Sequence, residues 1–159
     1  MPSFKVDGMD EFVNLCLKTD RTLTRVIGKS IYPAGKHMGN AIKKSLKNIK
    51  EDSGSHRHGL RKGPTSAQKK ALIESYGIAK MHAGSNGYNV KIGFDGYNGI
   101  VTKKYPKGQP NAMIARSVNS GTSFMEAQPF MDATVAKETD ATVEIIKDRF
   151  ENEMQKLWK

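Results

Sequence analysis

The sequence predicts an α+β fold, with a long helix at each end and a small antiparallel β-sheet with a hairpin between them. Two long stretches place apolar residues three or four positions apart, which is typical of an amphipathic helix. A short stretch between them alternates apolar and polar residues, which is typical of a half-buried strand. A chain of 159 residues suits one hydrophobic core, so we expect a single domain over residues 1–159.

The first helix is predicted from Gly8 to Lys50, with Asp7 in place to cap its start. Pro33 interrupts the pattern together with Gly35, and proline removes a backbone donor, so a break or kink near Pro33 is expected. The apolar positions at helical spacing are Met9, Phe12, Val13 and Cys16, then Leu23, Val26, Ile27 and Ile31, then Met38, Ile42, Leu46 and Ile49. The last of these three sets leaves Lys43, Lys47 and Lys50 on the opposite, polar face.

Residues 51–64 lack apolar periodicity and are rich in glycine and serine, so we expect a flexible basic loop there. His56 and His58 have no cysteine or carboxylate pair nearby, so an exposed basic loop is favoured over a metal site. Thr65 is a suitable capping residue for a short helix that ends near Gly77.

The alternation of Tyr88, Val90, Ile92 and Phe94 with polar or small residues predicts a half-buried strand. The turn dipeptides Asp95-Gly96 and Asn98-Gly99 follow it, and residues 100–102 are expected to return as the second strand of a hairpin. A basic, proline-containing loop follows over residues 103–110. Pro110 suits the first turn of a short helix that ends before Gly121, although a strand is the alternative.

The second long helix is predicted from Pro129 to Trp158, after a bend at Ala127-Gln128-Pro129-Phe130. Its apolar positions are Val135, Val143, Ile146, Phe150, Met154 and Leu157. A helix of this length spans roughly 40 Å, which is more than a small sheet can cover. Part of it is therefore expected to meet a neighbouring subunit.

The formal net charge of +10 comes largely from residues 43–70, which favours a polyanion such as DNA or an acidic protein face, or else a solvated helix face. Cys16 is the only cysteine, so it cannot form an internal disulfide, and its apolar neighbours predict a buried thiol. No run of apolar residues is long enough to span a membrane, and no secretion signal is recognisable at the start of the chain.

No motif of an enzyme or of a cofactor site passes its context test. Gly93, Gly96 and Gly99 lie in the predicted hairpin and not between a strand and a helix, as nucleotide binding would require. The acidic residues gather in the two terminal helices, where they resemble solvated faces. We therefore expect no enzyme, no cofactor and no metal.

An ordered set of segments resembles a family of small tail-component proteins of long-tailed bacteriophages. The segments are Gly87–Tyr97, Lys103–Pro106, Asn111–Ser117, Ser120–Ser123 and the turn Ala127–Phe130, between a helix with a basic Gly59-Leu60 loop and a long last helix. The chain departs from the family at Val118-Asn119-Ser120, where many members are acidic, and at His56-Arg57-His58, where many have a proline.

The resemblance implies a structural virion protein of the phage neck or tail, a tail-completion or head–tail joining subunit made in the bacterial host cytoplasm. It implies a homo-oligomeric ring, a hexamer, at the head-proximal end of the tail. Its neighbours would be neck, tail-terminator, tail-tube or sheath proteins, with transient contact to DNA in the lumen. The expected assembly contacts are His56, Arg57, His58, Leu60, Arg61, Gly121, Thr122, Pro129, Phe130, Phe150, Leu157 and Trp158.

The alternative is a basic nucleic-acid-binding protein of a phage or mobile element. Tyr88, Phe94, Tyr97 and Tyr105 share a region with several lysines, and exposed rings beside positive charge can stack on bases. Tyr88 and Phe94, however, lie on the face of the strand that is expected to be core.

Overall fold

The computed structural model describes residues 9–54, 59–84 and 87–157, and the side chains of the first helix from Asp20 onward. The helices are α1 (Met9–Lys47), α2 (Ser66–Ser75), α3 (Asn111–Ser120) and α4 (Phe130–Gln155). The strands are β1 (Tyr76–Ile78), β2 (His82–Gly84), β3 (Gly87–Asn89) and β4 (Ile92–Phe94). The predicted α+β class, with a long helix at each end, is confirmed.

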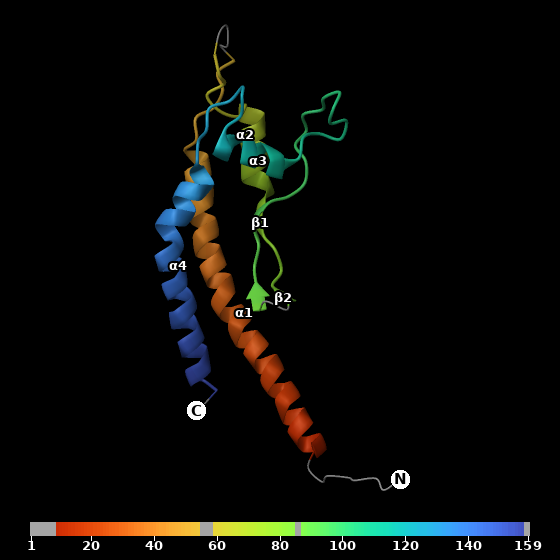
Figure 1. The fold of residues 1–159 in the computed structure, drawn as a ribbon, viewed down its shortest axis with the longest axis vertical. Coiled ribbons are helices and arrows are strands. Elements are labelled where there is room, and N and C mark those ends of the chain that lie inside the picture. The colour runs from red at the N-terminus through yellow and green to blue at the C-terminus, as the bar shows by residue number, and fades with distance from the viewer. Residues whose placement is uncertain (1–8, 55–58, 85–86, 158–159) are drawn as a thin grey trace.

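The two long helices lie side by side and form an elongated shaft, and α1 continues beyond the C-terminal end of α4 (Figure 1). Lys29 Nζ meets Glu153 Oε2 at 2.6 Å, and His37 Nε2 meets Glu138 Oε2 at 3.0 Å. A later residue of α1 thus pairs with an earlier residue of α4, so the helices run antiparallel. The partner of the last helix is therefore α1 and not a sheet.

The hydrophobic core lies at one end of the shaft, which we call the packed end (Figure 1). There α2 and α3 close over the last turns of α1 and the first turn of α4. Its buried side chains are Ile42, Leu46, Ile49, Leu72, Ile114, Ala115, Val118, Met125 and Phe130. Phe94 meets the ring of Tyr76 at 5.2 Å and that of Phe130 at 6.2 Å, both edge to face, and so joins β4 to this core.

Pro33 lies inside α1 and does not end it. The helix changes direction along its course but continues to Lys47 (Figure 1). A proline within a helix removes one backbone hydrogen bond and bends the axis. Packing of α4 on one side and of the strands on another holds the two halves of α1 together. The expected interruption is therefore a bend, and the alternative of a break is wrong.

The prediction that residues 100–102 pair with the strand before them is wrong. Residues 100–102 form no strand, and β4 pairs instead with β1, which precedes it, in the register Tyr76↔Phe94 to Ile78↔Ile92. β2 pairs with β3 further out, so residues 76–84 and 87–94 form one antiparallel arm. Tyr88, Val90, Ile92 and Phe94 are all half-buried, as the alternation predicts. The predicted single strand is wrong, because β3 ends at Asn89 and β4 begins at Ile92 in a different sheet.

This arm packs along a face of α1 that is formed by glycines. A Cβ atom on Gly35 would lie 3.8 Å from both Val90 and Ile92, and one on Gly39 would lie 3.5 Å from Tyr76. Polar contacts fix the arm further out: Tyr88 Oη pairs with Thr24 Oγ1 at 2.9 Å, and Tyr32 Oη accepts from Met81 N at 2.7 Å.

The two short helices begin and end where the sequence predicts. Thr65 and Gln68 form a capping box at the start of α2, with each side chain bonded to the other's backbone. Pro110 precedes the first turn of α3, which excludes the alternative of a strand. Gly121 ends α3 with a φ of 73°, and a Cβ there would lie 2.9 Å from Ala127 N.

The buried face of α4 differs from the predicted one. Val135 and Val143 are among the predicted apolar positions, but they are 43% and 41% exposed in the isolated chain. Phe130 and Thr134 are buried at the start of the helix, and Glu138 faces His37 of α1. The helix itself is confirmed, although it ends at Gln155 and leaves Leu157 beyond it.

Candidate assembly surface

Two segments that lie about sixty residues apart in the sequence meet at the tip of the packed end. Arg61 N donates to Phe124 O at 2.9 Å, and Glu126 N donates to Arg61 O at 2.8 Å. Thr122 and Met125 close a turn around Phe124 through backbone bonds of 2.9 and 3.3 Å. The Gly59-Leu60 loop and the Gly121-Thr122 turn therefore form one continuous surface.

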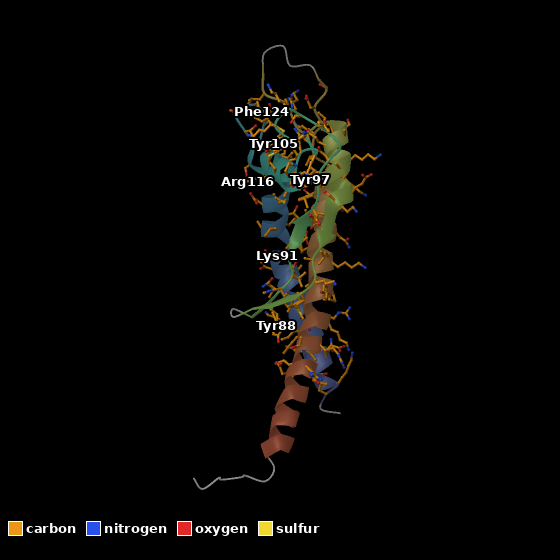
Figure 2. The ribbon with its side chains drawn as sticks, turned by 90° about the vertical axis from the view of Figure 1, so that its right-hand side faces the viewer. Tyr88, Lys91, Tyr97, Tyr105, Arg116 and Phe124 are labelled. Carbon is orange, nitrogen blue, oxygen red and sulfur yellow. The ribbon has the colours of Figure 1, made fainter. Side chains whose placement is uncertain are left out.

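We call this surface the end patch and define it as Leu60, Arg61, Thr122 and Phe124. Leu60 is 47% exposed and Phe124 is 58% exposed, although both are large and apolar. Figure 2 shows Phe124 near the tip of the molecule, on the same side as Tyr105 and Arg116. Exposed apolar side chains on neighbouring backbones are typical of a surface that contacts another protein.

The backbone beneath the end patch is held by the side chain of Gln128. Its Oε1 accepts from Lys50 N at 2.7 Å, and its Nε2 donates to Lys62 O at 2.7 Å and to Lys50 O at 3.1 Å. Asp52 N donates to Pro64 O at 2.9 Å and closes the base of the loop. A Cβ on Gly63 would lie 1.9 Å from Lys50 O, so only glycine fits.

Acidic residues at the base of the loop are neutralised by nearby bases. Arg61 Nε lies 3.8 Å from Asp52 Oδ2, and Lys69 Nζ lies 3.1 Å from Glu51 Oε1. The hydroxyl of Ser66 and the ammonium of Lys69 bond the Glu51 carboxylate and lower its pKa. The predicted loop is confirmed over its described positions, its base is held by hydrogen bonds, and its flexibility stays a prediction.

The structure separates the predicted contact residues into two groups. Leu60, Arg61, Gly121 and Thr122 come together at the end patch. Phe150 is half-buried on α4, and Leu157 is 50% exposed beyond the other end of that helix. His56, Arg57, His58 and Trp158 lie outside the described residues, as does the side chain of Cys16.

Phe130 is a correction to the predicted contacts. It is only 4% exposed and belongs to the core, where its ring packs against Phe94. Pro129 precedes it as the exposed capping position of α4. The motif Ala127–Phe130 therefore anchors the turn from inside, and its phenylalanine offers no surface to a partner.

Phe124 and Val101 are exposed apolar residues that sequence reasoning missed, at 58% and 66% exposure. Tyr97, named above only as a ring that could stack on bases, is exposed as well, at 62%. Tyr97 and Val101 lie on a loop that projects from the packed end. Its base is fixed by the buried Asn98, whose Oδ1 accepts from Gln109 N at 3.0 Å. The sequence signal that could have identified these residues is a large apolar side chain in a segment without helical or strand periodicity.

A second feature is a line of basic residues along α1, which we call the basic stripe. At 3.6 residues per turn, its members share one face of the helix. That face lies between the side that packs on α4 and the side that packs on the β arm. The stripe consists of Arg21, Arg25, Lys29, Lys36, Lys43 and Lys47. Side chains that end in nitrogen project from α1 into solvent along one edge of the molecule (Figure 2).

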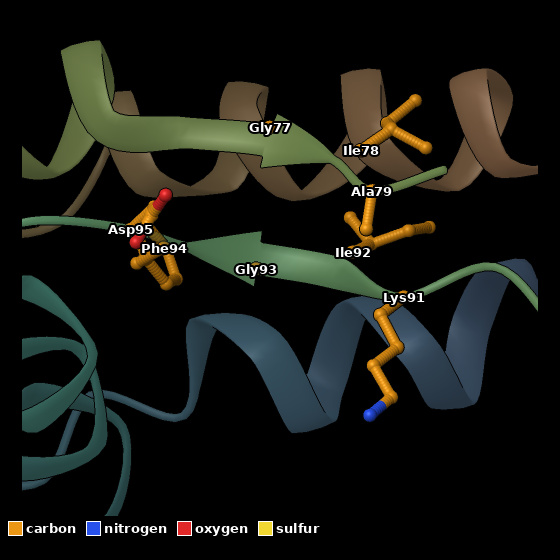
Figure 3. A pocket seen from close by; sticks show the side chains of 8 residues that line it. All are labelled: Gly77, Ile78, Ala79, Lys91, Ile92, Gly93, Phe94 and Asp95. Carbon is orange, nitrogen blue, oxygen red and sulfur yellow. The ribbon is translucent and has the colours of Figure 1, made fainter. Parts of the chain in front are cut away.

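The surface of the described residues has several hollows. One lies over the β1–β4 pair and is lined by residues 77–79 and 91–95, among which only Lys91 and Asp95 are ionisable (Figure 3). Lys91 points away from β1 in this view. Within the part of the chain that the structure describes, no three histidine, cysteine or acidic side chains gather to hold a metal ion.

Over the described residues, none of the helices combines the length and the apolar character needed to cross a bilayer. Comparison of the chain with protein-family models, with curated proteins and with solved structures finds no match.

Proposed function

We propose that this chain is a structural subunit of the neck or tail of a long-tailed bacteriophage, which completes the tail or joins it to the head. In this proposal several copies form a ring at the head-proximal end of the tail. One observation supports it most. The Gly59-Leu60 loop and the Gly121-Thr122 turn, both part of the resemblance, meet in one exposed apolar surface.

The construction of the end patch supports a role in binding another protein. Gln128 and the Asp52–Pro64 bond fix the backbone below Leu60 and Arg61 before any partner arrives. A surface that is already ordered loses less conformational entropy on binding. The partners that fit this proposal are further copies of the chain and the adjacent neck, tail-terminator, tail-tube or sheath proteins.

The proposal is tested with phage particles that carry changes in the end patch. Leu60→Asp with Phe124→Asp should leave the thermal unfolding midpoint almost unchanged, because both side chains are exposed in the isolated chain. The same variant should fail to enter particles, and electron microscopy should show unjoined heads and tails. Phe124→Leu keeps an apolar surface and is the matched control. Infectious particles with normal joined tails in the absence of the protein would contradict the proposal.

The basic stripe favours a second candidate, a nucleic-acid-binding protein. Its lysines and arginines could neutralise phosphates, and such binding weakens steeply with salt. A titration against duplex DNA at increasing salt separates the two candidates. Tight binding with a steep salt slope favours the second, and the absence of binding near physiological salt, together with incorporation into tails, favours the first.

A further inference from the structure

The outer face of α4 is acidic and partly apolar, and nothing in the described chain covers it. Seven residues of α4 are acidic and three are basic. Asp140, Glu144 and Glu151 are exposed on one face, together with Val143, which is 41% exposed. Lys147 lies on the same face and pairs with Glu144 at 3.1 Å, so Asp140 and Glu151 are the carboxylates left for a partner. Ala133 and Ala136 continue the same face, and such small side chains let another helix approach closely.

The outer face of α1 has the opposite charge. From Arg25 to Lys47 the basic stripe runs for about 33 Å at 1.5 Å per residue. Of its members, Lys29 is paired with Glu153. Lys36, Lys43 and Lys47 form no ion pair with any residue that the structure describes. This positive face therefore lacks a partner over the described parts of the same chain.

A shallow groove runs beside the basic stripe, where the β arm meets α1. Its floor is apolar and is formed by Gly28, Tyr32, Pro33 and Met81. Arg21 and Arg25 lie along its rim. Gly28 has no side chain, and a Cβ there would touch only Met81, at 3.6 Å, so the floor stays open. An apolar floor with a basic rim is complementary to a helix that shows a valine between carboxylates.

We propose that α4 of a second copy of this chain docks on the basic stripe of α1. Val143 of one copy then lies over the groove, while Asp140 and Glu151 face the arginines and lysines of the next. The two surfaces differ, so each copy keeps one of each kind free for further neighbours. Contacts of this type close into a ring when the rotation between copies is right. The inference rests on the proposed function only because it assumes that the copies form a ring.

Charge complementarity favours a second copy of the chain over DNA as the partner of the basic stripe. A nucleic acid would use the basic stripe and leave the acidic face of α4 unexplained. A second copy uses both faces at once, and it matches the apolar groove with the exposed Val143. Complementary charge also steers the encounter and rejects wrong registers, because like charges repel.

The test uses two charge-reversed variants of the full chain. The first is Arg25→Glu with Lys36→Glu, and the second is Asp140→Lys with Glu151→Lys. All four side chains are exposed, so both variants should fold. Lys103→Glu with Lys107→Glu, on a loop away from both faces, is the matched control.

Sedimentation at low and high salt measures self-association. The unchanged chain and the control should associate beyond a dimer and weaken with salt, whereas each reversed variant alone should associate about tenfold more weakly or worse. An equimolar mixture of the two reversed variants should recover association, because every contact then joins opposite charges. Variants that associate like the unchanged chain, a mixture that does not recover, or an unchanged chain that stays monomeric would overturn the interface.

A parallel titration with duplex DNA separates the remaining outcome. If the first variant loses DNA binding while its self-association is unchanged, the stripe is a nucleic-acid surface and the proposal is wrong. Failure of this interface leaves the proposed function standing if changes in the end patch still block assembly of particles. Failure of the proposed function leaves the interface standing if the mixture of variants still recovers.

Discussion

The packed end and the shaft are built from different kinds of side chain. At the packed end the buried residues are large, as with Leu46, Leu72 and Val118, which are fully inaccessible. Along the shaft the buried positions of α1 are small: Val26, Ser30 and Ala34, with glycines facing the β arm. Apolar area removed from water is the main source of stability. The packed end therefore supplies most of the folding free energy, and the shaft supplies long, polar surfaces that are available for contact.

The largest expected effect is the loss of a large side chain from the packed end. Leu46→Ala should lower the free energy of unfolding by about 3 kcal/mol, because it leaves a cavity in the core. Val26→Ala in the shaft should lower it by about 1.5 kcal/mol, because less volume is removed. Chemical denaturation measures both. An equal loss of unfolding free energy in the two variants would contradict the difference between the packed end and the shaft.

The next effect concerns the backbone below the end patch. Gly63→Ala should destabilise the protein by about 2 kcal/mol or more, because the new methyl group would overlap Lys50 O. Gly59→Ala is the matched control on the same loop, since a Cβ there meets nothing within 4 Å. Thermal unfolding compares the two variants. Similar thermal unfolding midpoints for the two variants would show that the backbone at the base of the loop can move and that the end patch is not preformed.

Tyr76 is where the packed end meets the shaft, and its hydroxyl is buried without a hydrogen-bond partner in the described structure. Burial raises the pKa of Tyr76 to about 12 from its ordinary value of 10. The folded state therefore favours the protonated phenol, and its contribution to stability is complete below pH 10 and falls as the pH rises toward 12.

Tyr76→Phe removes both the unpartnered hydroxyl and the ionisation. We expect it to raise the free energy of unfolding by about 1 kcal/mol at neutral pH and to flatten the decline between pH 10 and 12. Denaturation curves across that range measure both effects. Tyr88→Phe, which loses a hydroxyl bonded to Thr24, is the matched control and should not stabilise. An unchanged alkaline decline in Tyr76→Phe would show that other groups cause it.

Local sequence signals predicted the helices but not the pairing of the strands. The capping box at Thr65, the proline before α3 and the glycine after it act within a few residues, so their effect is legible in the sequence. β1 and β2 lie in a stretch without clear alternation, whereas Asp95-Gly96 resembles a hairpin turn. Asp95 accepts from Gly96 N at 2.7 Å, but the chain then continues into the projecting loop.

The sequence predicts only part of the candidate site, for the same reason. Leu60 and Thr122 were expected contacts, but their meeting through the backbone bonds of Arg61 depends on a non-local arrangement. Phe130 was misplaced, because a phenylalanine after a turn is equally compatible with surface and core. The length of α4 predicts that one side of it is uncovered. Which valines lie on that side depends on where α1 packs, and this cannot be deduced from the sequence.

A smaller effect is expected where the β arm packs on α1. Gly35→Ala should raise the free energy of unfolding by about 0.5–1 kcal/mol, because alanine restricts the unfolded chain and suits a helix. The added methyl group would lie 3.8 Å from Val90 and Ile92, which is ordinary contact distance. Gly121→Ala, at a φ of 73°, is the contrasting control and should destabilise. A loss of stability in Gly35→Ala would show that the arm needs a closer approach than the structure gives.

The smallest effect concerns the polar contacts that join α1 to α4 in the shaft. Hydrogen bonds from Lys156 and Lys29 lower the pKa of Glu153 to about 2 from its ordinary value of 4.5. A carboxylate with a lowered pKa stabilises the fold above pH 4.5, and this contribution is lost as the pH falls from 4.5 toward 2. Glu153→Gln should therefore flatten the acid decline in stability over that interval.

Glu151→Gln removes one carboxylate from the exposed face of the same helix and is the matched control for Glu153→Gln. Urea denaturation at several pH values between 2 and 7 measures both variants. An acid decline that is the same in Glu153→Gln and in the unchanged chain would mean that the Lys29–Glu153 pair does not fix α4 on α1. The shaft would then depend on its small buried residues and on the His37–Glu138 pair, and the helices could shift relative to one another when a second copy binds.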